Sequence, residues 1–363
     1  MARIGINALY LIPGGVGGTE IYLRELLEAM ARIDTSNLYF VFTNLDTGPD
    51  LVPRQANFHQ KVQSVRARFR PARILWEQTV LPLEAARYRL DVLFNPGFTS
   101  PLLAPCPSIT VFHDLQHKRH PEHFRSFDLP FWRLLLWMAA HRSRRLIATS
   151  EATRTDLQRY YRIPGKSVTV IPHGVGDRFF ALDRSRTEPY LLYVATLHPH
   201  KNHERLLRAY ARRPRRERLV LAGIAGFHAK AVEALIAQLN LGDSVHLTGW
   251  IPREELYRLY AHAAACVIPT TFEGFGMPVL EALAAGIPTA CSDIPPLRES
   301  AGDAALFFDP LDESAIAAAL DRITEDELLR RTLAQSGPQQ ARMFTWERTA
   351  RKTLEILLSI QLD

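Results

Sequence analysis

Residues 271–288 read Thr-Phe-Glu-Gly-Phe-Gly-Met-Pro-Val-Leu-Glu-Ala-Leu-Ala-Ala-Gly-Ile-Pro, and an apolar run at 265–269 precedes them. The apolar run predicts a buried strand. Pro278 fits the first position of a helix, where its missing N–H costs nothing, and Gly286 is a typical stop at a helix C-terminus. The stretch therefore predicts a strand, a glycine-containing loop and a helix, the repeating unit of an α/β sheet.

Two carboxylates flank the start of this predicted helix. Glu273 lies in the loop after the strand, and Glu281 lies in the first turns of the helix. Gly274 and Gly276 let the backbone approach a ligand closely, and the free backbone N–H groups of a helix N-terminus favour an anion. One segment thus offers two carboxylates for sugar hydroxyls and a site for a diphosphate.

The same alternation of strand and helix extends over the whole chain. Near-continuous apolar runs, typical of strands buried on both faces of a parallel sheet, occur at residues 4–8, 39–43, 92–95, 109–112, 146–149 and 168–171, and again at 190–195, 219–222, 245–247, 265–269 and 288–291. Apolar residues at helical spacing mark segments 20–33, 202–211, 229–239, 254–264 and 345–362. Strands that alternate with helices predict a doubly wound α/β fold.

A polar, unpatterned segment at 177–189 separates two series of predicted strands. We therefore expect two Rossmann-like domains, one at 1–178 and one at 179–344, with the helix at 345–363 returning to the first domain. Open α/β sheets bind ligands at the carboxyl ends of their strands. The expected site accordingly lies in a cleft between the two sheets.

The composition is that of an ordinary globular protein. The chain has 363 residues, of which 47% are hydrophobic and 23% charged, and its net charge is +6. The three cysteines, Cys106, Cys266 and Cys291, form neither a disulfide framework nor a zinc-binding spacing. The sequence has no signal-peptide pattern and no apolar run of the roughly 20 residues that span a bilayer. These features predict a reduced, cytoplasmic protein.

Two further segments predict phosphate binding. Lys201 follows a predicted strand that ends near Thr196, and at this position its ammonium can reach a phosphate. A glycine-rich turn at 12–20 follows the first strand of the chain, and such turns cradle phosphate with backbone N–H groups. Gly15 and Gly17 in this turn are followed by Glu20 where a dinucleotide-binding motif needs glycine, which disfavours a nicotinamide-dependent enzyme.

Together these residues resemble the family 4 retaining glycosyltransferases, which have two Rossmann-like domains (the GT-B architecture) and two glutamates separated by seven residues. Glu273 and Glu281 have this spacing. The resemblance implies that Glu273 contacts the transferred sugar and that Glu281 contacts the ribose of a nucleotide-sugar donor. It further implies that Lys201 binds the donor phosphates and that His113, after the strand at 109–112, contacts the transferred sugar. Glu273, Lys201 and His113 are therefore the predicted catalytic residues.

The same resemblance places the other donor-binding residues and divides the chain into an acceptor-side first domain and a donor-binding second domain. These donor-binding residues are Gly15, Gly17, Thr196, Trp250, Gly274, Phe275 and Gly276. Trp250 lies where family members receive the nucleotide base, although packing in the core is an equal alternative. Three positions depart from the family pattern, because Ala195-Thr196 stands in place of Gly-Arg and His173 stands in place of Asn.

The implied activity is retaining transfer of a hexosyl group, with mannosyl and rhamnosyl as candidates, from a nucleoside-diphosphate sugar to a glycan or lipid-linked acceptor. The sequence contains no Asp-x-Asp motif, so we expect neither a metal nor another cofactor. A sugar-nucleotide epimerase and a phosphorylase are alternatives, although Lys230 and Lys352 lack the glycine-rich context of a phosphorylase cofactor lysine. A nucleic-acid-binding protein is a third alternative, which the missing aromatic platforms disfavour.

Arginines and aromatic residues are interleaved at 66–73 and 131–145 in the first predicted domain. Such a surface can hold an enzyme at the inner face of a membrane, near a lipid-linked acceptor. The alternative is that Trp132, Leu135, Leu136 and Trp137 belong to the core.

Overall fold

The computed structural model describes residues 1–14, 17–124, 127–214 and 217–359. The chain forms two units, the first made of Met1–Gly174 and Trp346–Asp363 and the second of Val175–Thr345. The predicted boundary after residue 178 lies four residues beyond the observed one. Val175 N donates to Phe344 O over 3.0 Å, and Phe179 is buried in the core of the second unit, so this segment packs with the residues that follow it.

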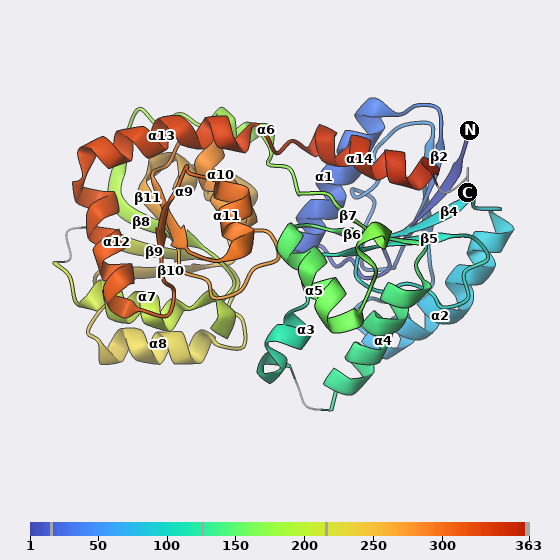
Figure 1. Ribbon diagram of the computed structural model, residues 1–363, viewed down its shortest axis with the longest axis horizontal. Helices are drawn as coiled ribbons and strands as arrows, with labels where there is room; N and C mark the ends of the chain where they lie inside the picture. Colours follow the sequence, from blue (N-terminus) through green and yellow to red (C-terminus); the bar gives the residue numbers. More distant parts are fainter. Residues whose placement is uncertain (15–16, 125–126, 215–216, 360–363) are drawn as a thin grey trace. The chain divides into compact units, whose positions relative to one another are not determined.

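The first unit contains a seven-stranded parallel sheet in the order β3-β2-β1-β4-β5-β6-β7 (Figure 1). Its strands are β1 (Arg3–Asn7), β2 (Leu38–Thr43), β3 (Phe58–Val62), β4 (Val92–Asn95), β5 (Ser108–Phe112), β6 (Arg145–Ala148) and β7 (Val168–Val170). β4 and β5 are buried along their whole length, and β2 is buried after Leu38, as their near-continuous apolar runs predict.

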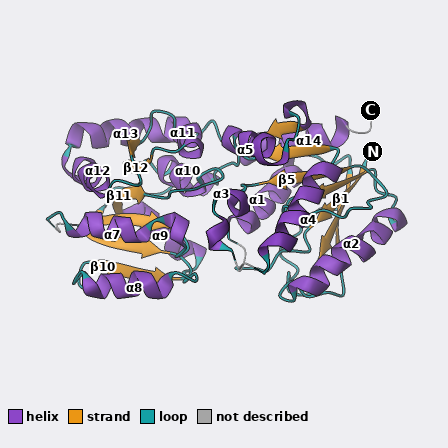
Figure 2. Cartoon of the chain, turned by 60° about the horizontal axis from the view of Figure 1, so that its bottom comes forward, coloured by secondary structure: helices purple, strands orange, loops and turns teal. Residues whose placement is uncertain are grey.

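Helices cover both faces of this sheet (Figure 2). They are α1 (Gly18–Ile33), α2 (Arg70–Arg87), α3 (Gln116–Arg119), α4 (Leu129–Arg142), α5 (Glu151–Tyr161) and α14 (Trp346–Ser359), with single 3-10 turns η1 (Pro121–His123) and η2 (Gly165–Ser167). The predicted return of the C-terminal helix is confirmed, because Trp346, Ala350 and Leu357 of α14 are buried in one cluster with Leu23 and Leu27 of α1.

The second unit repeats the architecture with a six-stranded parallel sheet in the order β10-β9-β8-β11-β12-β13. Its strands are β8 (Glu188–Val194), β9 (Arg218–Ala222), β10 (Val245–Gly249), β11 (Ala263–Ile268), β12 (Thr289–Ser292) and β13 (Leu306–Phe308). Its helices are α6 (Asp177–Phe180), α7 (His203–Ala211), α8 (Ala229–Gln238), α9 (Arg253–His262), α10 (Met277–Ala284), α11 (Pro295–Ala301), α12 (Glu313–Glu325) and α13 (Glu327–Ala341), with the 3-10 turn η3 (Pro199–Lys201). Both units have the predicted doubly wound α/β fold.

Over the described ranges, no helix combines the length and the apolar character that crossing a bilayer requires.

Candidate functional site

Lys201 and Glu273 lie at the carboxyl ends of two neighbouring strands of the second unit. Lys201 ends the turn that follows β8, Glu273 lies in the loop that follows β11, and β8 pairs with β11. Their side chains form an ion pair with 2.5 Å between Lys201 Nζ and Glu273 Oε1. The two side chains are 17% and 13% exposed, so the pair is accessible to a ligand yet partly desolvated.

Hydrogen bonds to backbone carbonyl oxygens fix these two loops to each other. The carbonyl oxygen of His200 accepts from Thr271 N over 2.8 Å and from Thr270 Oγ1 over 2.9 Å. Asn202 adopts the left-handed conformation, with φ of +60°, and its Nδ2 donates to the carbonyl oxygens of Pro269 and Pro310, each over 2.8 Å. The ion pair is thus held on a rigid frame.

Gly276 immediately precedes α10 and requires glycine on two grounds. Its φ is +97°, and a Cβ atom there would lie 2.3 Å from Leu297 Cδ2. Pro278 lies in the first turn of α10, at the second helical position and not at the predicted first, because the helix begins at Met277. The turn therefore brings the chain from Glu273 into the helix that carries Glu281.

Glu281 is 7% exposed on α10. Tyr260 Oη donates a hydrogen bond to Glu281 Oε2 over 2.8 Å. Burial, followed by the charge of Glu281, raises the pKa of Tyr260 well above its usual value, so the phenol keeps its proton and remains a donor. Tyr260 was not recognised in the sequence, where it is one of several apolar positions on a predicted helix.

The other predicted donor-binding residues of the second unit differ in exposure. Trp250 is 64% exposed after β10, so the alternative that it packs in the core is wrong. Phe275 is 4% exposed and packs edge-on against Phe344, which leaves its backbone alone to contact a ligand. Thr196 is partly exposed in the loop after β8. This loop packs so tightly on the next that a Cβ at Gly223 would lie 2.1 Å from the Ala195 carbonyl oxygen.

The glycine-rich turn of the first unit is described in part. Gly15 lies outside the described residues. Gly17 precedes α1 with φ of +59°, and a Cβ there would meet no described atom within 4 Å. Gly14 N donates to Glu20 Oε2 over 2.7 Å, so Glu20, at the position where a dinucleotide motif has glycine, braces the turn.

His113 lies after β5 and is 7% exposed. Its Nε2 lies 2.8 Å from the Pro96 carbonyl oxygen, and its Nδ1 lies 3.2 Å from His173 Nε2. A carbonyl only accepts, so Nε2 carries the proton of His113 and Nδ1 accepts from His173. Burial lowers the pKa of His113 to about 4 and that of His173 well below its usual value. Both ring nitrogens of His113 are therefore engaged within the protein, and a sugar would have to displace one of these contacts.

Aromatic rings enclose this histidine pair. Tyr22 lies edge-on to His113 with centroids 4.8 Å apart, and Trp346 of α14 stacks on His173 with centroids 6.0 Å apart. The sequence contained one signal for the pair, the histidine at 173 where the family pattern has asparagine.

In the described ranges, one cluster of side chains has ligand atoms close enough together to hold a metal ion. His120, Glu122 and His123, at the end of α3 and in η1, have ligand atoms within 4.8 Å of one another. This cluster belongs to the first unit, whereas Lys201 and Glu273 belong to the second.

Two family models together match nearly all of the chain. The model described as Glycosyltransferase Family 4 matches residues 16–178, and the model described as Glycosyl transferases group 1 matches residues 177–340. The chain belongs to glycosyltransferase family 4. This glycosyltransferase is an enzyme of hexosyl transfer, and the spacing of Glu273 and Glu281 is that of the family motif.

Curated relatives and solved structures agree with this assignment. The O-antigen chain mannosyltransferase B of Escherichia coli is 29% identical to the glycosyltransferase over 262 residues, which are 68% of this chain and 69% of that protein. The O-antigen chain mannosyltransferase RfbU of Salmonella typhimurium is 29% identical over 62% of this chain and 63% of that protein. Sucrose-phosphate synthase from Thermosynechococcus elongatus has the same fold, with a TM-score of 0.82, 22% identity and 99% of each chain covered.

Proposed function

We propose that the glycosyltransferase moves a mannosyl group, with retention of configuration, from a nucleoside-diphosphate sugar to a glycan or lipid-linked acceptor. The observation that carries the donor assignment is the Lys201–Glu273 ion pair, whose two loops are hydrogen-bonded to each other. The helix that follows Glu273 carries Glu281. The mannosyl assignment is supported by the two O-antigen mannosyltransferases that share 29% identity with the chain.

The donor is bound by groups of matching chemistry. The ammonium of Lys201 and the N-terminus of α10 suit the diphosphate. The Glu281 carboxylate, oriented by Tyr260, suits the two ribose hydroxyls, and exposed Trp250 offers a surface on which a base can stack. Glu273 contacts the sugar whose bond to phosphate breaks.

In the proposed reaction, an acceptor hydroxyl attacks the anomeric carbon from the face that the diphosphate leaves. The new carbon–oxygen bond forms as the carbon–phosphate-oxygen bond breaks, and the departing phosphate oxygen takes the hydroxyl proton. Lys201 stabilises the negative charge on the leaving diphosphate, and Glu273 stabilises the positive charge on the sugar ring. His113 is the proposed sugar contact of the first unit, and burial lowers its pKa to about 4, which keeps the ring neutral.

The charge of the diphosphate is balanced without a divalent metal in this proposal. The groups that support it are Lys201 and the start of α10. The His120, Glu122 and His123 cluster lies in the other unit and has no part in it.

The acceptor side includes a proposed contact with the inner face of a membrane. Leu135 and Leu136 of α4 are buried, whereas Phe131, Leu134 and Trp137 recur every three residues and are each about half exposed. The alternative that this segment is core therefore holds for one side of α4. The guanidinium of Arg70 lies 4.2 Å from the centre of the Trp132 ring, which joins the two arginine-rich and aromatic segments. An apolar strip beside arginines suits an anionic lipid surface.

A donor screen tests the enzymatic proposal. Release of nucleoside diphosphate is measured with nucleotide sugars that carry mannose, rhamnose or glucose, and the product anomer is assigned by NMR. An α product from an α donor is expected with the mannose donor. Inversion, or a clear preference for another sugar, would contradict it.

Vesicle sedimentation tests the membrane contact separately. More protein should sediment with anionic than with neutral vesicles at low salt, and the double variant Phe131→Ser, Trp137→Ser should lose this binding. Equal recovery of the native chain with both vesicle types would exclude the contact.

A further inference from the structure

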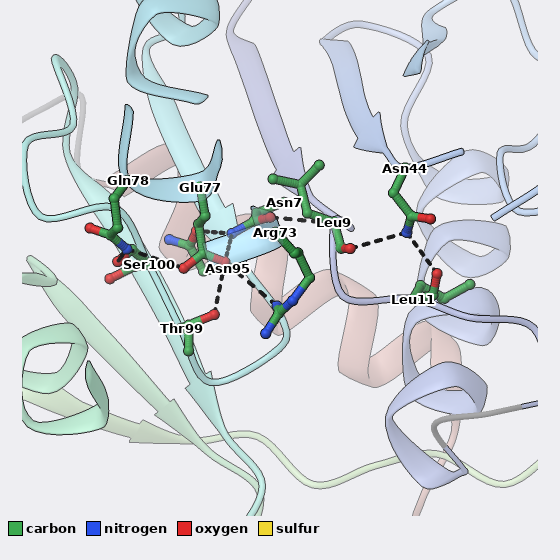
Figure 3. A network of polar contacts seen from close by, with 10 residues as sticks. All are labelled: Asn7, Leu9, Leu11, Asn44, Arg73, Glu77, Gln78, Asn95, Thr99 and Ser100. Carbon is green, nitrogen blue, oxygen red and sulfur yellow. Dashed lines mark hydrogen bonds and ion pairs between the residues drawn. The ribbon is translucent and has the colours of Figure 1, made fainter. Parts of the chain in front are cut away.

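A buried polar network lies at the carboxyl ends of β1 and β4 in the first unit (Figure 3). Asn7 Nδ2 donates to Asn95 Oδ1 over 3.1 Å and to Glu77 Oε2 over 3.2 Å. Glu77 Oε2 also accepts from Thr99 Oγ1 over 2.8 Å, and Glu77 Oε1 accepts from Gln78 Nε2 over 3.3 Å. Glu77 is 1% exposed, so neutral donors satisfy a fully buried carboxylate.

Arg73 lies one helical turn before Glu77 on α2. Unlike the Glu77 carboxylate, its guanidinium has no hydrogen-bond partners in the described ranges. The Arg73 side chain is 7% exposed, and its nearest approach to a carboxylate is 4.0 Å, from Nη1 to Glu77 Oε2. A guanidinium offers five N–H donors, and leaving them unused in a buried position is costly.

The guanidinium nitrogens of Arg73 nevertheless reach solvent. Some described polar atoms have neither solvent contact nor a hydrogen-bond partner. Ser100 Oγ, in the same region, is such an atom, and the Arg73 nitrogens are not. Burial lowers the pKa of Arg73, and Glu77 offsets this only in part. Arginine stays protonated at any physiological pH. The positive charge of Arg73 is therefore only partly compensated by Glu77, and an anion can reach its guanidinium from the solvent.

One short loop joins this network to His113. Pro96 O accepts from His113 Nε2, and the Phe98 ring lies edge-on to His113 with centroids 5.1 Å apart. The next residue, Thr99, donates to Glu77. Phe98 has φ of +70°, a strained conformation for a residue with a side chain, which such contacts must stabilise. The loop therefore connects Glu77 to His113 within one unit, through Thr99 on one side and Pro96 and Phe98 on the other.

We propose that Arg73 binds a phosphate or diphosphate group on the acceptor and that Glu77 is the positioning residue for it. This inference deepens the proposed function and rests on it, since it assumes that the first unit binds the acceptor. A guanidinium matches phosphate oxygens through two parallel hydrogen bonds. The phosphate can belong to a lipid-linked glycosyl diphosphate or to a soluble glycosyl phosphate.

The binding test uses inorganic pyrophosphate as the probe. The full chain is titrated by calorimetry in excess GDP or UDP, which occupies the donor site. Arg73→Gln should weaken pyrophosphate binding about 10- to 100-fold, the loss expected for charge-assisted hydrogen bonds. The control is Arg87→Gln, on the same helix, whose exposed guanidinium pairs with Glu84 over 3.4 Å and should bind pyrophosphate normally. Native affinity in folded Arg73→Gln would overturn the proposal.

Kinetics assign the phosphate to the acceptor. Pyrophosphate should compete with the acceptor, and competition with the donor alone would refute the proposal. Arg73→Gln and Glu77→Gln should raise KM for a phosphate-bearing acceptor and leave KM for the donor unchanged. An equal rise for a neutral glycan of the same sugars would count against it. Comparison of long-chain lipid with short soluble phosphates distinguishes the two sources.

Two further variants distinguish the loss of phosphate binding from the loss of folding. Arg73→Gln with Glu77→Gln removes both buried charges, and its folding is checked by circular dichroism and thermal unfolding. Arg73→Lys keeps the charge without the planar fork, and about 3- to 10-fold weaker pyrophosphate binding is expected; unchanged binding would speak against the proposal. If the native chain transfers no sugar from any donor, the proposed function fails, while the pyrophosphate titration still tests Arg73.

Discussion

Lys201 and Glu273 are 72 residues apart in the sequence, and their side chains form an ion pair of 2.5 Å. The first was expected to bind donor phosphate and the second the transferred sugar, yet each neutralises the other in the protein without ligand. In the proposed donor site, a diphosphate must therefore compete with the Glu273 carboxylate for the ammonium of Lys201. We expect this competition to weaken the binding of free nucleoside diphosphate and to favour a donor whose sugar engages Glu273.

Glu273→Gln should separate binding from catalysis. The variant should lower kcat by about 10²- to 10³-fold, the loss expected for one preorganised charge-stabilising group. It should also tighten the binding of free nucleoside diphosphate about two- to fivefold, because a partly exposed ion pair contributes up to about 1 kcal/mol. Kinetics and calorimetry measure the two effects, and weaker diphosphate binding in this variant would contradict the competition.

Lys201→Ala should lower kcat by about 10²- to 10³-fold, because the ammonium acts most strongly as charge develops on the leaving diphosphate. Glu273 loses its partner in this variant, so donor binding should weaken as well. The control is Lys230→Ala on α8, an exposed lysine of the same unit. A near-normal kcat for Lys201→Ala would show that other groups hold the phosphate.

Glu281→Gln should raise KM for the donor and the Kd of nucleoside diphosphate, with a smaller effect on kcat, because the ribose does not react. Tyr260→Phe removes the hydrogen bond that orients Glu281 and keeps the aromatic ring. It should therefore weaken nucleoside diphosphate binding less than Glu281→Gln does. Calorimetry with nucleoside diphosphate measures both. A Tyr260→Phe effect equal to that of Glu281→Gln would mean that the tyrosine touches the donor itself.

Turnover should be insensitive to chelators. If Lys201 and the start of α10 carry the diphosphate charge, excess EDTA should leave the initial rate unchanged. The measurement is diphosphate release with and without chelator, followed by addition of Mg²⁺ or Mn²⁺. Loss of activity that these ions restore would refute a metal-independent mechanism.

Stability should fall in mild acid because His113 and His173 are buried as neutral rings. Their folded-state pKa values lie below the unfolded value of about 6.5, that of His113 at about 4. The contribution is therefore full above about pH 6.5 and is lost as pH falls towards 4, at up to about 1.4 kcal/mol per pH unit for each ring.

Urea unfolding between pH 7.5 and 5 measures this slope. His173→Asn, whose amide can still donate to His113 Nδ1, should make the slope shallower. It should not abolish the slope, because burial also lowers the pKa of His117 and of His203, each to about 3. An unchanged slope in His173→Asn would show that this ring does not titrate on unfolding.

The sequence predicted strands well where both faces of the sheet are covered and missed two others. Those two, β3 and β13, are edge strands with a neighbour on one side only. β3 has polar residues at 59–61 and an exposed Val62, so it shows no apolar run, whereas β13 is only three residues long although it lies in the apolar run 304–308. Phe58 nevertheless stacks on Tyr39 with ring centroids 4.2 Å apart, a tertiary contact that periodicity cannot encode.

The sequence predicted the local motifs of the candidate site, but it did not predict which side chains from distant segments contact each other. The glycines, Pro278 and the two glutamates reflect local backbone needs, so they stand together in the sequence. The contacts between Lys201 and Glu273, between His113 and His173, and between Asn7 and Glu77 each join segments 60 or more residues apart. Such pairings depend on strand order, which the order of residues does not reveal.

The return of α14 to the first unit affects the order in which the chain folds during synthesis. The second unit is one continuous segment, and it is synthesised entirely before Trp346 is added. The first unit, although it begins earlier, gains the ring that covers His173 only with α14. The first unit is thus completed in sequence after the second, although domains generally fold in N-to-C order. A chain truncated after residue 345 would contain every residue of the second unit and would lack the Trp346 ring that stacks on His173.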